Sequence, residues 1–368
     1  MTNNSETVLE IDLTALEHNF NFFKSIIQPS TKFLGVAKAY AYGSDAILIA
    51  KKLESLKVDY FAVAYVNEGV QLREAGIETP ILVLHPQPSN FEILIQKNLE
   101  PNLYSHRVLD LFLKVASENN LNNYPVHLKF NTGLNRLGFE KKDIDRIAKT
   151  LNTGEELKVV SIFSHLAASE DLNEKEFTLK QIESFNLIGE EFITKLGIHP
   201  FKHILNTSGI INYTHAQLDM VRSGIGLYGY GNTPEIDQKL KPVVTLKTAI
   251  SQIHYIEPNE SVGYNRKHIS NKKQKIATLP LGHADGIGRQ YGNGKTYVLV
   301  NGKKAYIIGN ICMDMIMIDV SKIDCKEGDQ VEVFGKSLSA EDFSFTANTI
   351  TYELLTGISQ RVKRNVKD

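Results

Sequence analysis

Several side chains that can do chemistry stand at or just after the ends of apolar runs in this 368-residue chain. They are two lysines, a histidine, two arginines and two turns rich in Gly, Ser and Thr: Lys38, Lys129, His165, Arg136, Arg222, 206–209 and 222–226. A lysine desolvated at the end of an apolar strand has a lowered pKa, and its neutral amine can attack a carbonyl carbon. The two turns offer backbone N–H groups and the Thr207 hydroxyl, which suit a phosphate group. A reactive amine with a phosphate cradle suggests pyridoxal phosphate, a cofactor that acts as an electron sink.

Each of these residues also has a structural interpretation. Lys38 taken alone is typical of a surface lysine at a strand end, and His165 alone is typical of a hydrogen-bonded structural histidine. Arg222 could belong to a structural ion pair, and Gly224 and Gly226 could simply be turn residues. The cofactor hypothesis depends on several weak signals that fall at the same end of different strands.

Strands that alternate with helices are expected to position these side chains. Amphipathic stretches separate eight short apolar runs, at 33–37, 60–64, 81–84, 101–104, 126–130, 159–163, 203–205 and 220–222. Such alternation predicts parallel βαβ units, and eight of them fit a (β/α)8 TIM barrel of class α/β. A doubly wound open sheet is the alternative. In a barrel, the ends of the strands meet at one mouth, where active sites lie.

The pattern changes after 229–241 to strand-like runs separated by turns, at 243–255, 275–279, 296–300, 305–311, 315–320 and 330–334. Asn301-Gly302 lies between two of these runs and predicts a two-residue hairpin, because a type I′ turn needs positive φ at both positions. A helix over 340–358 is expected to follow the strands. We therefore predict a barrel domain over residues 1–237 and a predominantly β domain over 238–368.

Composition limits the classes of partner. The 41 Lys and Arg residues balance 42 Asp and Glu residues, which offers no basic surface for nucleic acid. Two cysteines cannot form a disulfide framework or a Cys-rich zinc site, and we expect no metal. The first residues lack the features of a secretory signal, and no apolar run approaches the roughly 20 residues of a membrane span. A cytoplasmic protein without a membrane contact is expected.

The ordered motifs of the chain resemble those of alanine racemases, a family of fold-type III pyridoxal-phosphate enzymes. The resemblance covers nearly the whole sequence. It is carried by VAKAYAYG at 36–43, HLKFNTG at 127–133, RLG at 136–138, IFSH at 162–165, 203–209, 221–229, SVGY at 261–264, 282–286 and CMD at 312–314. It implies a barrel followed by a β domain, working as a homodimer that interconverts L- and D-alanine, with D-alanine used for peptidoglycan synthesis.

The resemblance also implies roles for individual residues. Lys38 should hold pyridoxal phosphate as an aldimine, and Tyr264 of the partner subunit should face Lys38 across the cofactor. Racemisation needs an acid/base group on each face of a planar carbanion, since one group alone would return the proton to the side it left. In the family the lysine serves D-alanine and the tyrosine serves L-alanine.

Further positions match the family's supporting residues. His165 should stack on the pyridine ring and Arg222 should bind its nitrogen, leaving that nitrogen unprotonated. The remaining cofactor-binding positions, mostly around the phosphate, are Tyr42, Asn206, Thr207, Gly224, Ile225 and Tyr352. Arg136 and the backbone of Met313 should receive the substrate carboxylate. Lys129 matches a lysine that is carbamylated in some relatives, with a plain ion pair as the alternative.

Several positions depart from the family pattern. Tyr40 stands where many relatives have Asn, and Ser44 where many have His. Polar substitutions elsewhere are Asn131 for Asp, Asn265 for Gly and Asn310 for Arg. His283 replaces a tyrosine that lines the substrate entrance, to which Asp314 also belongs. These departures change the expected entrance and charge network but remove no reacting group.

Three other functions remain open. A broad-specificity amino-acid racemase would share both bases and differ only in the shape of its pocket. A fold-type III decarboxylase fits the paired Lys38 and Tyr264 less well. A non-catalytic pyridoxal-phosphate carrier would resemble the barrel alone, whereas this chain keeps the β domain.

Overall fold

The computed structural model describes residues 6–152 and 154–367, which form two compact units. Among these residues, the barrel unit comprises 16–41, 46–152 and 154–241, and the sheet unit comprises 6–15, 42–45 and 242–367. This division differs from the one predicted at 237/238, because the first strand of the chain and a short segment after Lys38 belong to the sheet unit. This first strand pairs by backbone hydrogen bonds with strands that come much later in the chain. No local pattern in its sequence predicts that pairing.

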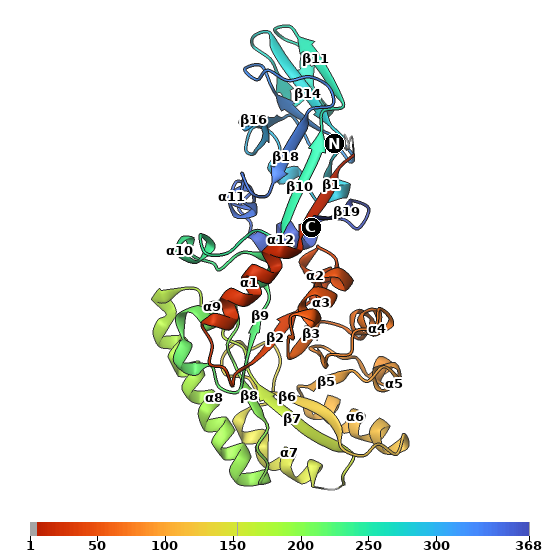
Figure 1. The fold of residues 1–368 in the computed structure, drawn as a ribbon, viewed down its shortest axis with the longest axis vertical. Coiled ribbons are helices and arrows are strands. Elements are labelled where there is room, and N and C mark those ends of the chain that lie inside the picture. The colour runs from red at the N-terminus through yellow and green to blue at the C-terminus, as the bar shows by residue number, and fades with distance from the viewer. Residues whose placement is uncertain (1–5, 153, 368) are drawn as a thin grey trace. The chain divides into compact units, whose positions relative to one another are not determined.

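Eight parallel strands form the barrel (Figure 1). They are β2 (Lys32–Val36), β3 (Tyr60–Val63), β4 (Ile81–Val83), β5 (Glu100–Leu103), β6 (Tyr124–Lys129), β7 (Leu157–Phe163), β8 (Phe201–His203) and β9 (Met220–Ser223). Their order is β8-β7-β6-β5-β4-β3-β2-β9. The last strand thus pairs with the first, with Leu34 opposite Arg222. Backbone hydrogen bonds from Asp219 N to Lys202 O and from Arg222 N to Leu205 O, both 3.1 Å, link β9 to the β8 segment. The (β/α)8 prediction is confirmed, and the open doubly wound sheet was wrong.

Helices follow the strands around the barrel. They are α1 (Leu13–Ser25), α3 (Ala46–Ser55), α4 (Val66–Glu74), α5 (Phe91–Gln96), α6 (His106–Glu118), α7 (Ile144–Leu151), α8 (Lys175–Leu196) and α9 (Thr207–Asn212). In α6, Val108, Phe112 and Ala116 are buried at a spacing of four residues, which makes one apolar face. Its N-cap Ser105 accepts a hydrogen bond from Val108 N at 3.3 Å. Among the helices of residues 6–152 and 154–367, none has the length and apolar character that crossing a membrane requires.

The interior of the barrel is filled by side chains from several strands. One buried cluster joins Leu34, Tyr60, Leu82, Phe163 and Met220, which come from β2, β3, β4, β7 and β9. Burying one such side chain fully contributes about 1.5–3 kcal/mol relative to leaving it exposed. The barrel is therefore a packed core, and its chemistry belongs at the ends of the strands.

A nine-stranded sheet dominates the sheet unit, in the order β11-β14-β17-β16-β15-β18-β10-β1-β19. The strands are β1 (Val8–Asp12), β10 (Val244–Ala249), β11 (Gln252–Ile256), β14 (Gln274–Leu279), β15 (Tyr297–Val300), β16 (Lys303–Ile308), β17 (Ile316–Asp319), β18 (Gln330–Phe334) and β19 (Lys363–Lys367). The β1 strand runs antiparallel to β10 and parallel to β19. The predicted hairpin is confirmed, since Asn301 and Gly302 have φ of 48° and 72° between β15 and β16.

Two elements of the sheet unit are divided where the sequence predicted single ones. The run 243–255 forms β10 and β11, because Ile250 N bonds Asp329 O at 3.0 Å and Ser251 N bonds Thr278 O at 2.8 Å. The backbone thus leaves one neighbouring strand and joins another. The predicted helix 340–358 is α11 (Ala340–Phe345) and α12 (Thr351–Gly357), with Asn348 between them at a φ of 61°. The left-handed backbone of Asn348 lies in the turn that separates the two helices.

Candidate active site

Lys38 lies two residues after the end of β2 and begins a turn of left-handed helix, α2 (Lys38–Tyr42). Ala39, Tyr40, Ala41 and Tyr42 have φ of 53°, 56°, 51° and 55°. Residues with a Cβ pay about 1–2 kcal/mol each for this conformation, so surrounding contacts must hold the turn in place. Strain of this kind immediately beside a candidate reactive lysine indicates that its position is specified by the fold.

Glu68, in the first turn of α4, is the main polar group that holds the turn. One of its carboxylate oxygens accepts a hydrogen bond from Ala39 N at 2.6 Å, and the other accepts from Ala64 N at 2.7 Å and Tyr65 N at 3.0 Å. Bonds from backbone N–H groups to an ionised acceptor are stronger than neutral ones. Glu68 therefore connects the residue after Lys38 to the end of β3.

The pKa of Lys38 is lowered from its ordinary value. Burial is the largest cause, and the positive charge of Arg136 acts in the same direction. The carboxylate of Glu68 opposes both by favouring the charged amine. The amine of Lys38 is thus more often neutral, and more nucleophilic, than that of a surface lysine.

Lys129 lies in β6 with its side chain buried and its Nζ 5.9 Å from the centre of the Phe163 ring. Burial lowers the pKa of Lys129 to about 8. Three neighbouring cations, Arg136, Arg222 and Lys38, lower it in the same direction. A pKa near 8 leaves about a fifth of the amine neutral at pH 7.4.

Arg222, in β9, is buried and surrounded by acceptors. One guanidinium nitrogen, Nη2, donates to Ser164 O at 2.7 Å and Ile204 O at 3.0 Å. Nη2 also lies 3.2 Å from His165 Nδ1, and Nη1 bonds His203 Nδ1. Burial lowers the pKa of Arg222 to about 9. These contacts fix the plane of the guanidinium at the mouth of the barrel.

His165 follows β7 and accepts a hydrogen bond through Nδ1, because arginine can only donate. Burial lowers the pKa of His165 well below its ordinary range, and Arg222, the largest of four neighbouring positive charges, acts in the same direction. His165 is thus neutral, with its proton on Nε2.

A hydroxyl and backbone N–H groups converge where β8 and β9 end. Thr207 Oγ1 lies 3.3 Å from Gly224 N, 3.4 Å from Gly226 N and 3.1 Å from Ser223 Oγ. A Cβ on Gly226 would lie 2.6 Å from the Thr207 side chain and 2.5 Å from the Phe23 ring, so this turn requires glycine. Ile225 follows Gly224 and begins the 3-10 helix η5 (Ile225–Tyr228).

Asn206 caps the helix that starts with Thr207. Its Oδ1 accepts hydrogen bonds from Gly209 N at 2.9 Å and Ser169 Oγ at 2.7 Å. Asn206 thereby holds Thr207 against the turn at the end of β9. A hydroxyl and several backbone N–H groups in one place suit a phosphate.

Arg136 lies in an exposed loop after β6, and Asn131 organises this loop. Asn131 Oδ1 accepts from Gly133 N at 3.2 Å and Asn135 N at 3.0 Å, while its Nδ2 donates to Asn135 and Glu140 side chains. Asn131 departs from the family pattern. An aspartate at this position could accept the two backbone hydrogen bonds, but it could not donate to Asn135 and Glu140 as the Asn131 amide does.

In the sheet unit, Tyr264 lies in a short loop, η6 (Tyr264–Arg266), with its side chain 72% exposed. Asn265 has a φ of 60°, and Asn310 Nδ2 donates to Tyr264 O at 3.1 Å. Asn is the residue besides glycine that best tolerates left-handed backbone. Two departures from the family pattern, Asn265 and Asn310, thus cooperate in holding the loop of the candidate second base.

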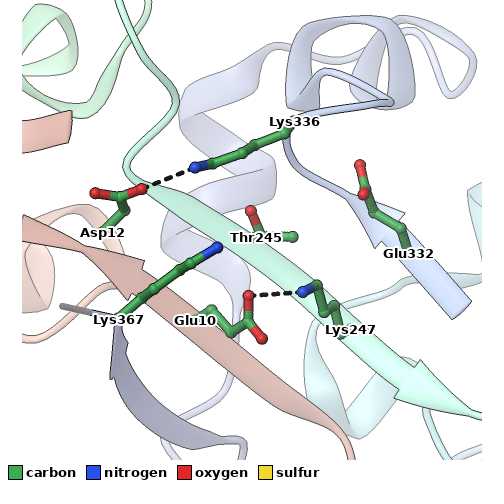
Figure 2. Close-up of a pocket in the computed structure, with 7 residues that line it drawn as sticks. All are labelled: Glu10, Asp12, Thr245, Lys247, Glu332, Lys336 and Lys367. Atoms are coloured by element: carbon green, nitrogen blue, oxygen red, sulfur yellow. Dashed lines mark hydrogen bonds and ion pairs between the residues drawn. The ribbon is translucent and has the colours of Figure 1, made fainter. Parts of the chain in front are cut away.

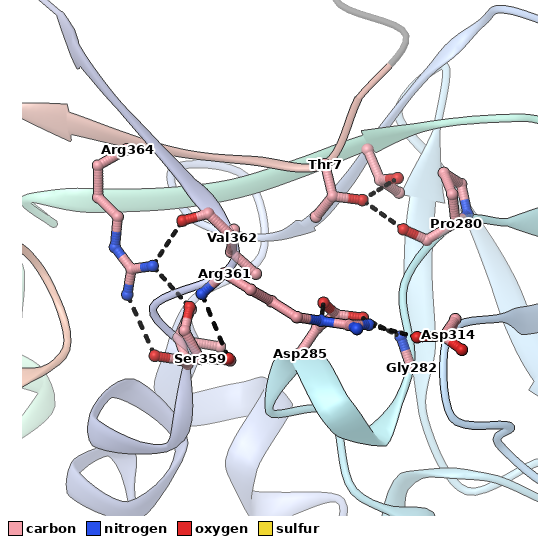
Figure 3. A network of polar contacts seen from close by, with 11 residues as sticks. Thr7, Pro280, Gly282, Asp285, Asp314, Ser359, Arg361, Val362 and Arg364 are labelled. Atoms are coloured by element: carbon pink, nitrogen blue, oxygen red, sulfur yellow. Dashed lines mark hydrogen bonds and ion pairs between the residues drawn. The ribbon is translucent and has the colours of Figure 1, made fainter.

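His283 and Asp314, the predicted entrance residues, lie on two segments that Arg361 links (Figure 3). Arg361 donates to both carboxylate oxygens of Asp285, at 2.7 and 3.0 Å, and to Asp314 at 2.6 Å. His283 N bonds Cys312 O at 3.0 Å. Hydrogen bonds to Asp285 and Asp314 raise the pKa of Arg361 above its ordinary value, so the Arg361 guanidinium stays positively charged.

Met313 and two tyrosines complete the predicted residues of the sheet unit. Met313 O accepts a hydrogen bond from Ala284 N at 3.0 Å, and the Met313 side chain is 58% exposed. The rings of Tyr42 and Tyr352 lie 6.0 Å apart with an angle of 49° between them. Burial and the neighbouring Tyr352 raise the pKa of Tyr42, which keeps its hydroxyl a hydrogen-bond donor.

A shallow pocket elsewhere in the sheet unit is lined by other residues: Glu10, Asp12, Thr245, Lys247, Glu332, Lys336 and Lys367 (Figure 2). Its charges pair with one another, as Lys336 with Asp12 and Lys247 with Glu10, each at 2.8 Å. Figure 2 shows Lys247 of β10 paired with Glu10 of the neighbouring β1, and Lys336, which follows β18, paired with Asp12 of β1. Within the part of the chain that the structure describes, no group of three or more His, Cys, Asp and Glu could hold a metal ion.

The structure thus gathers nine predicted residues in the barrel unit: Lys38, Lys129, Arg136, His165, Asn206, Thr207, Arg222, Gly224 and Ile225. The sheet unit holds the other six: Tyr42, Tyr264, His283, Met313, Asp314 and Tyr352. Glu68, His203 and Arg361 were not predicted as site residues from the sequence. An acidic residue in the first turn of a helix is a capping signal that could have indicated Glu68.

Two family models match the chain, the alanine racemase N-terminal domain over residues 11–232 and the alanine racemase C-terminal domain over 243–366. The chain belongs to the alanine racemase family. It is therefore an enzyme, and the family resemblance of the motifs is confirmed. An alanine racemase of Halothermothrix orenii is 38% identical, with 98% of this chain and 97% of the relative covered.

Solved structures of alanine racemases match the whole chain. The enzyme of Clostridium difficile 630 is 34% identical, with a TM-score of 0.91 and coverage of 98% of this chain and 95% of that one. The alanine racemase of Bartonella henselae, solved with covalently bound pyridoxal phosphate, is 30% identical, with a TM-score of 0.89 and coverage of 98% and 99%. The combination of a barrel and a C-terminal sheet domain is thus that of the family.

Proposed function

We propose that this member of the alanine racemase family interconverts L- and D-alanine with pyridoxal phosphate held by Lys38, and that the D-alanine serves peptidoglycan synthesis. The observation that carries the proposal is Lys38 itself. It stands at the mouth of the barrel on a strained turn, and its pKa is lowered by burial and Arg136. A family relative with pyridoxal phosphate bound covalently supports the choice of cofactor.

The residues present fit that cofactor. The neutral amine of Lys38 is the group that bonds an aldehyde carbon, and Thr207, Gly224 and Ile225 offer a hydroxyl and N–H groups to a phosphate. Asn206 holds the Thr207 turn, and Tyr42 and Tyr352 are the two further family positions for the phosphate. When bound, the cofactor delocalises the electron pair left on the α-carbon of an amino acid.

Arg222 would determine the protonation state of the pyridine nitrogen of bound pyridoxal phosphate. A guanidinium has donors only, so a nitrogen bound to it must accept and stays unprotonated. Neutral His165, hydrogen-bonded to Arg222 through Nδ1, is the matching position for a residue stacked on the ring. Arg222 would thus hold the ring nitrogen of bound pyridoxal phosphate unprotonated, and the cofactor would then supply weaker electron withdrawal than a protonated ring.

Two groups move the α-proton in this proposal. Lys38 removes it from or returns it to one face, and Tyr264 of the partner subunit acts on the other. A homodimer with shared active sites follows from this assignment. The exposed position of the Tyr264 side chain supports it, because a reacting group needs a surface that can meet a second chain.

Arg136 and the backbone of Met313 receive the substrate carboxylate, a role suited to a planar guanidinium. We expect Lys129 to carry a carbamate that faces Arg136. Carbamate forms from the neutral amine and carbon dioxide, and the pKa of about 8 supplies that neutral form. We place the enzyme in the cytoplasm, in keeping with its metabolic substrate.

A coupled assay of L-alanine to D-alanine tests the function directly. Wild type should racemise alanine, whereas Lys38→Ala and Tyr264→Phe should each lose nearly all activity. Parallel rates with serine, lysine and arginine test the alternative of a broad-specificity racemase, which His283 and Tyr40 near the expected substrate path leave open. A yellow protein with borohydride-reducible absorbance but no racemisation of any amino acid would instead identify a pyridoxal-phosphate carrier.

A further inference from the structure

A chain of buried hydrogen bonds crosses the barrel from Arg222 to a carboxylate at the start of β5. His203 Nδ1 bonds Arg222 Nη1, and His203 Nε2 lies 2.9 Å from Ser161 Oγ. Ser161 Oγ lies 2.6 Å from His127 Nδ1, and His127 Nε2 lies 2.7 Å from a carboxylate oxygen of Glu100. The five residues come from the neighbouring strands β9, β8, β7, β6 and β5.

All five side chains are removed from water. His127, Ser161 and His203 have no exposed surface, and Arg222 and Glu100 are 5% and 9% exposed. Polar groups buried in a barrel core are costly unless every one of them is hydrogen-bonded. Hydrophobic residues would fill these positions more cheaply, so the chain calls for an explanation beyond packing.

Chemistry fixes the direction of every hydrogen bond in this chain. Arginine only donates, so His203 Nδ1 must accept, and a neutral His203 carries its proton on Nε2. Burial lowers the pKa of His203 well below its ordinary range, with Arg222 and His127 contributing, so it is neutral. His203 then donates to Ser161, which leaves the Ser161 hydroxyl proton for His127 Nδ1.

The last bond follows from the others. His127 accepts through Nδ1, so its proton lies on Nε2 and is donated to the carboxylate of Glu100. The chain therefore begins at a group that can only donate and ends at one that accepts, with each proton pointing toward Glu100. Arg222 and Glu100 are thus connected across the interior of the barrel by three side chains, each of which accepts a hydrogen bond on one side and donates one on the other.

We infer that Glu100 is a positioning residue for Arg222, acting through His127, Ser161 and His203 to keep the guanidinium oriented and cationic. The inference rests on the proposed function, since it concerns the residue that faces the ring nitrogen. Electrostatic stabilisation of Arg222 through the chain explains why the carboxylate of Glu100 is buried at the end of the barrel opposite the mouth. Other charged or titratable groups around Glu100 are Arg73, Tyr60 and Tyr124.

The protonation of the two histidines tests the inference without any assay of activity. In the full-length protein labelled with 15N-histidine, with and without pyridoxal phosphate, the hydrogen-bond directions require His127 and His203 each to carry their ring proton on Nε2. In Glu100→Gln, the Nε2 proton signals of both residues should shift, because the acceptor at the end of the chain has lost its charge. A doubly protonated His127, an Nδ1-protonated His203, or a His203 signal unaffected by Glu100→Gln would overturn it.

Kinetics supply a second test. Glu100→Gln and Ser161→Ala should each lower kcat for alanine by about three- to tenfold, with KM changed by less than about twofold. The double variant should lose no more than the larger single loss, because both substitutions interrupt the same chain. A decrease in kcat of the double variant equal to the product of the two single decreases would contradict the inference.

Glu54→Gln is the matched control. Glu54 is another carboxylate that accepts hydrogen bonds, from Glu78 N, Thr79 N and Thr79 Oγ1, but it lies outside the chain from Glu100 to Arg222. Its kcat should stay within about twofold of wild type. A wild type that racemises no amino acid would remove the proposed function, whereas the histidine protonation states would still decide the inference.

Discussion

The candidate site residues of the barrel unit and those of the sheet unit differ in how they are held. Arg222 and Lys129 are buried, and the turn that follows Lys38 is fixed by Glu68. Tyr264 and Met313 expose 72% and 58% of their surfaces, and their backbones rather than their side chains are anchored. Arg222, Lys129 and the Lys38 turn are thus held in place within one chain, while Tyr264 and Met313 present exposed side chains. That contrast is what a site shared between two chains requires.

Removing Lys38 from the barrel unit and the Tyr264 hydroxyl from the sheet unit should lower activity equally. The two variants should differ in whether they still bind the cofactor. Lys38→Ala should lower racemisation by more than about a thousandfold and abolish borohydride-reducible absorbance. Tyr264→Phe should lower racemisation comparably, yet it should retain the absorbance and an unchanged Tm, since the lost hydroxyl is on an exposed side chain. A Tyr264→Phe variant that racemises alanine normally would remove the second base from the account.

Glu68→Gln should weaken the turn that follows Lys38 in the barrel unit. The substitution replaces one accepting oxygen with an NH2 group facing backbone N–H groups, so the free energy of unfolding should fall by about 1–3 kcal/mol. The carboxylate also raises the pKa of Lys38, and its loss should lower that pKa. In cofactor-free protein, the rate of pyridoxal phosphate capture should therefore begin to rise at a lower pH than in wild type.

The control for this experiment is again Glu54→Gln. It should lower stability by a similar amount because it also loses hydrogen bonds to backbone N–H groups. It should leave the pH dependence of cofactor capture unchanged, since Glu54 does not act on Lys38. An unshifted profile in Glu68→Gln would show that the carboxylate does not tune the lysine.

Lys129 offers a smaller test of the buried charges. With a pKa of about 8, its neutral fraction and hence carbamate formation should increase as the pH rises through that value. A 13C-bicarbonate NMR experiment should show a carbamate signal in wild type that is missing in Lys129→Arg. Bicarbonate should raise kcat by about twofold at most, because the residue acts through Arg136. A signal equal in both proteins would assign the carbamate to another amine.

The smallest expected effect concerns the loop of Tyr264. Asn265 has a left-handed backbone, so Asn265→Ala should cost about 1 kcal/mol of stability, whereas Asn265→Gly should be close to neutral. Denaturant unfolding of the three proteins measures this. Equal losses in both variants would show that the Asn265 side chain, rather than its backbone conformation, holds the loop.

The sequence predicted the order of barrel strands and the residues at their ends well, because both follow from local patterns. Alternating apolar runs and helices lead to a barrel, and a barrel brings the residues after its strands to one mouth. The left-handed turn had no such signal, since Ala39, Tyr40 and Ala41 do not favour that backbone. The pairing of β1 with β10 and the chain from Arg222 to Glu100 depend on contacts between distant residues, which one sequence does not reveal. Family resemblance, rather than spacing, supplied Tyr264.

Mixing two inactive variants tests the shared site most directly. When Lys38→Ala and Tyr264→Phe chains exchange subunits, half of the dimers should be mixed, and each mixed dimer should contain one site with both Lys38 and Tyr264 intact. Activity should return to about a quarter of wild type at equal concentrations. A mixture that demonstrably exchanges subunits and yet stays inactive would contradict a site built from Lys38 of one chain and Tyr264 of another.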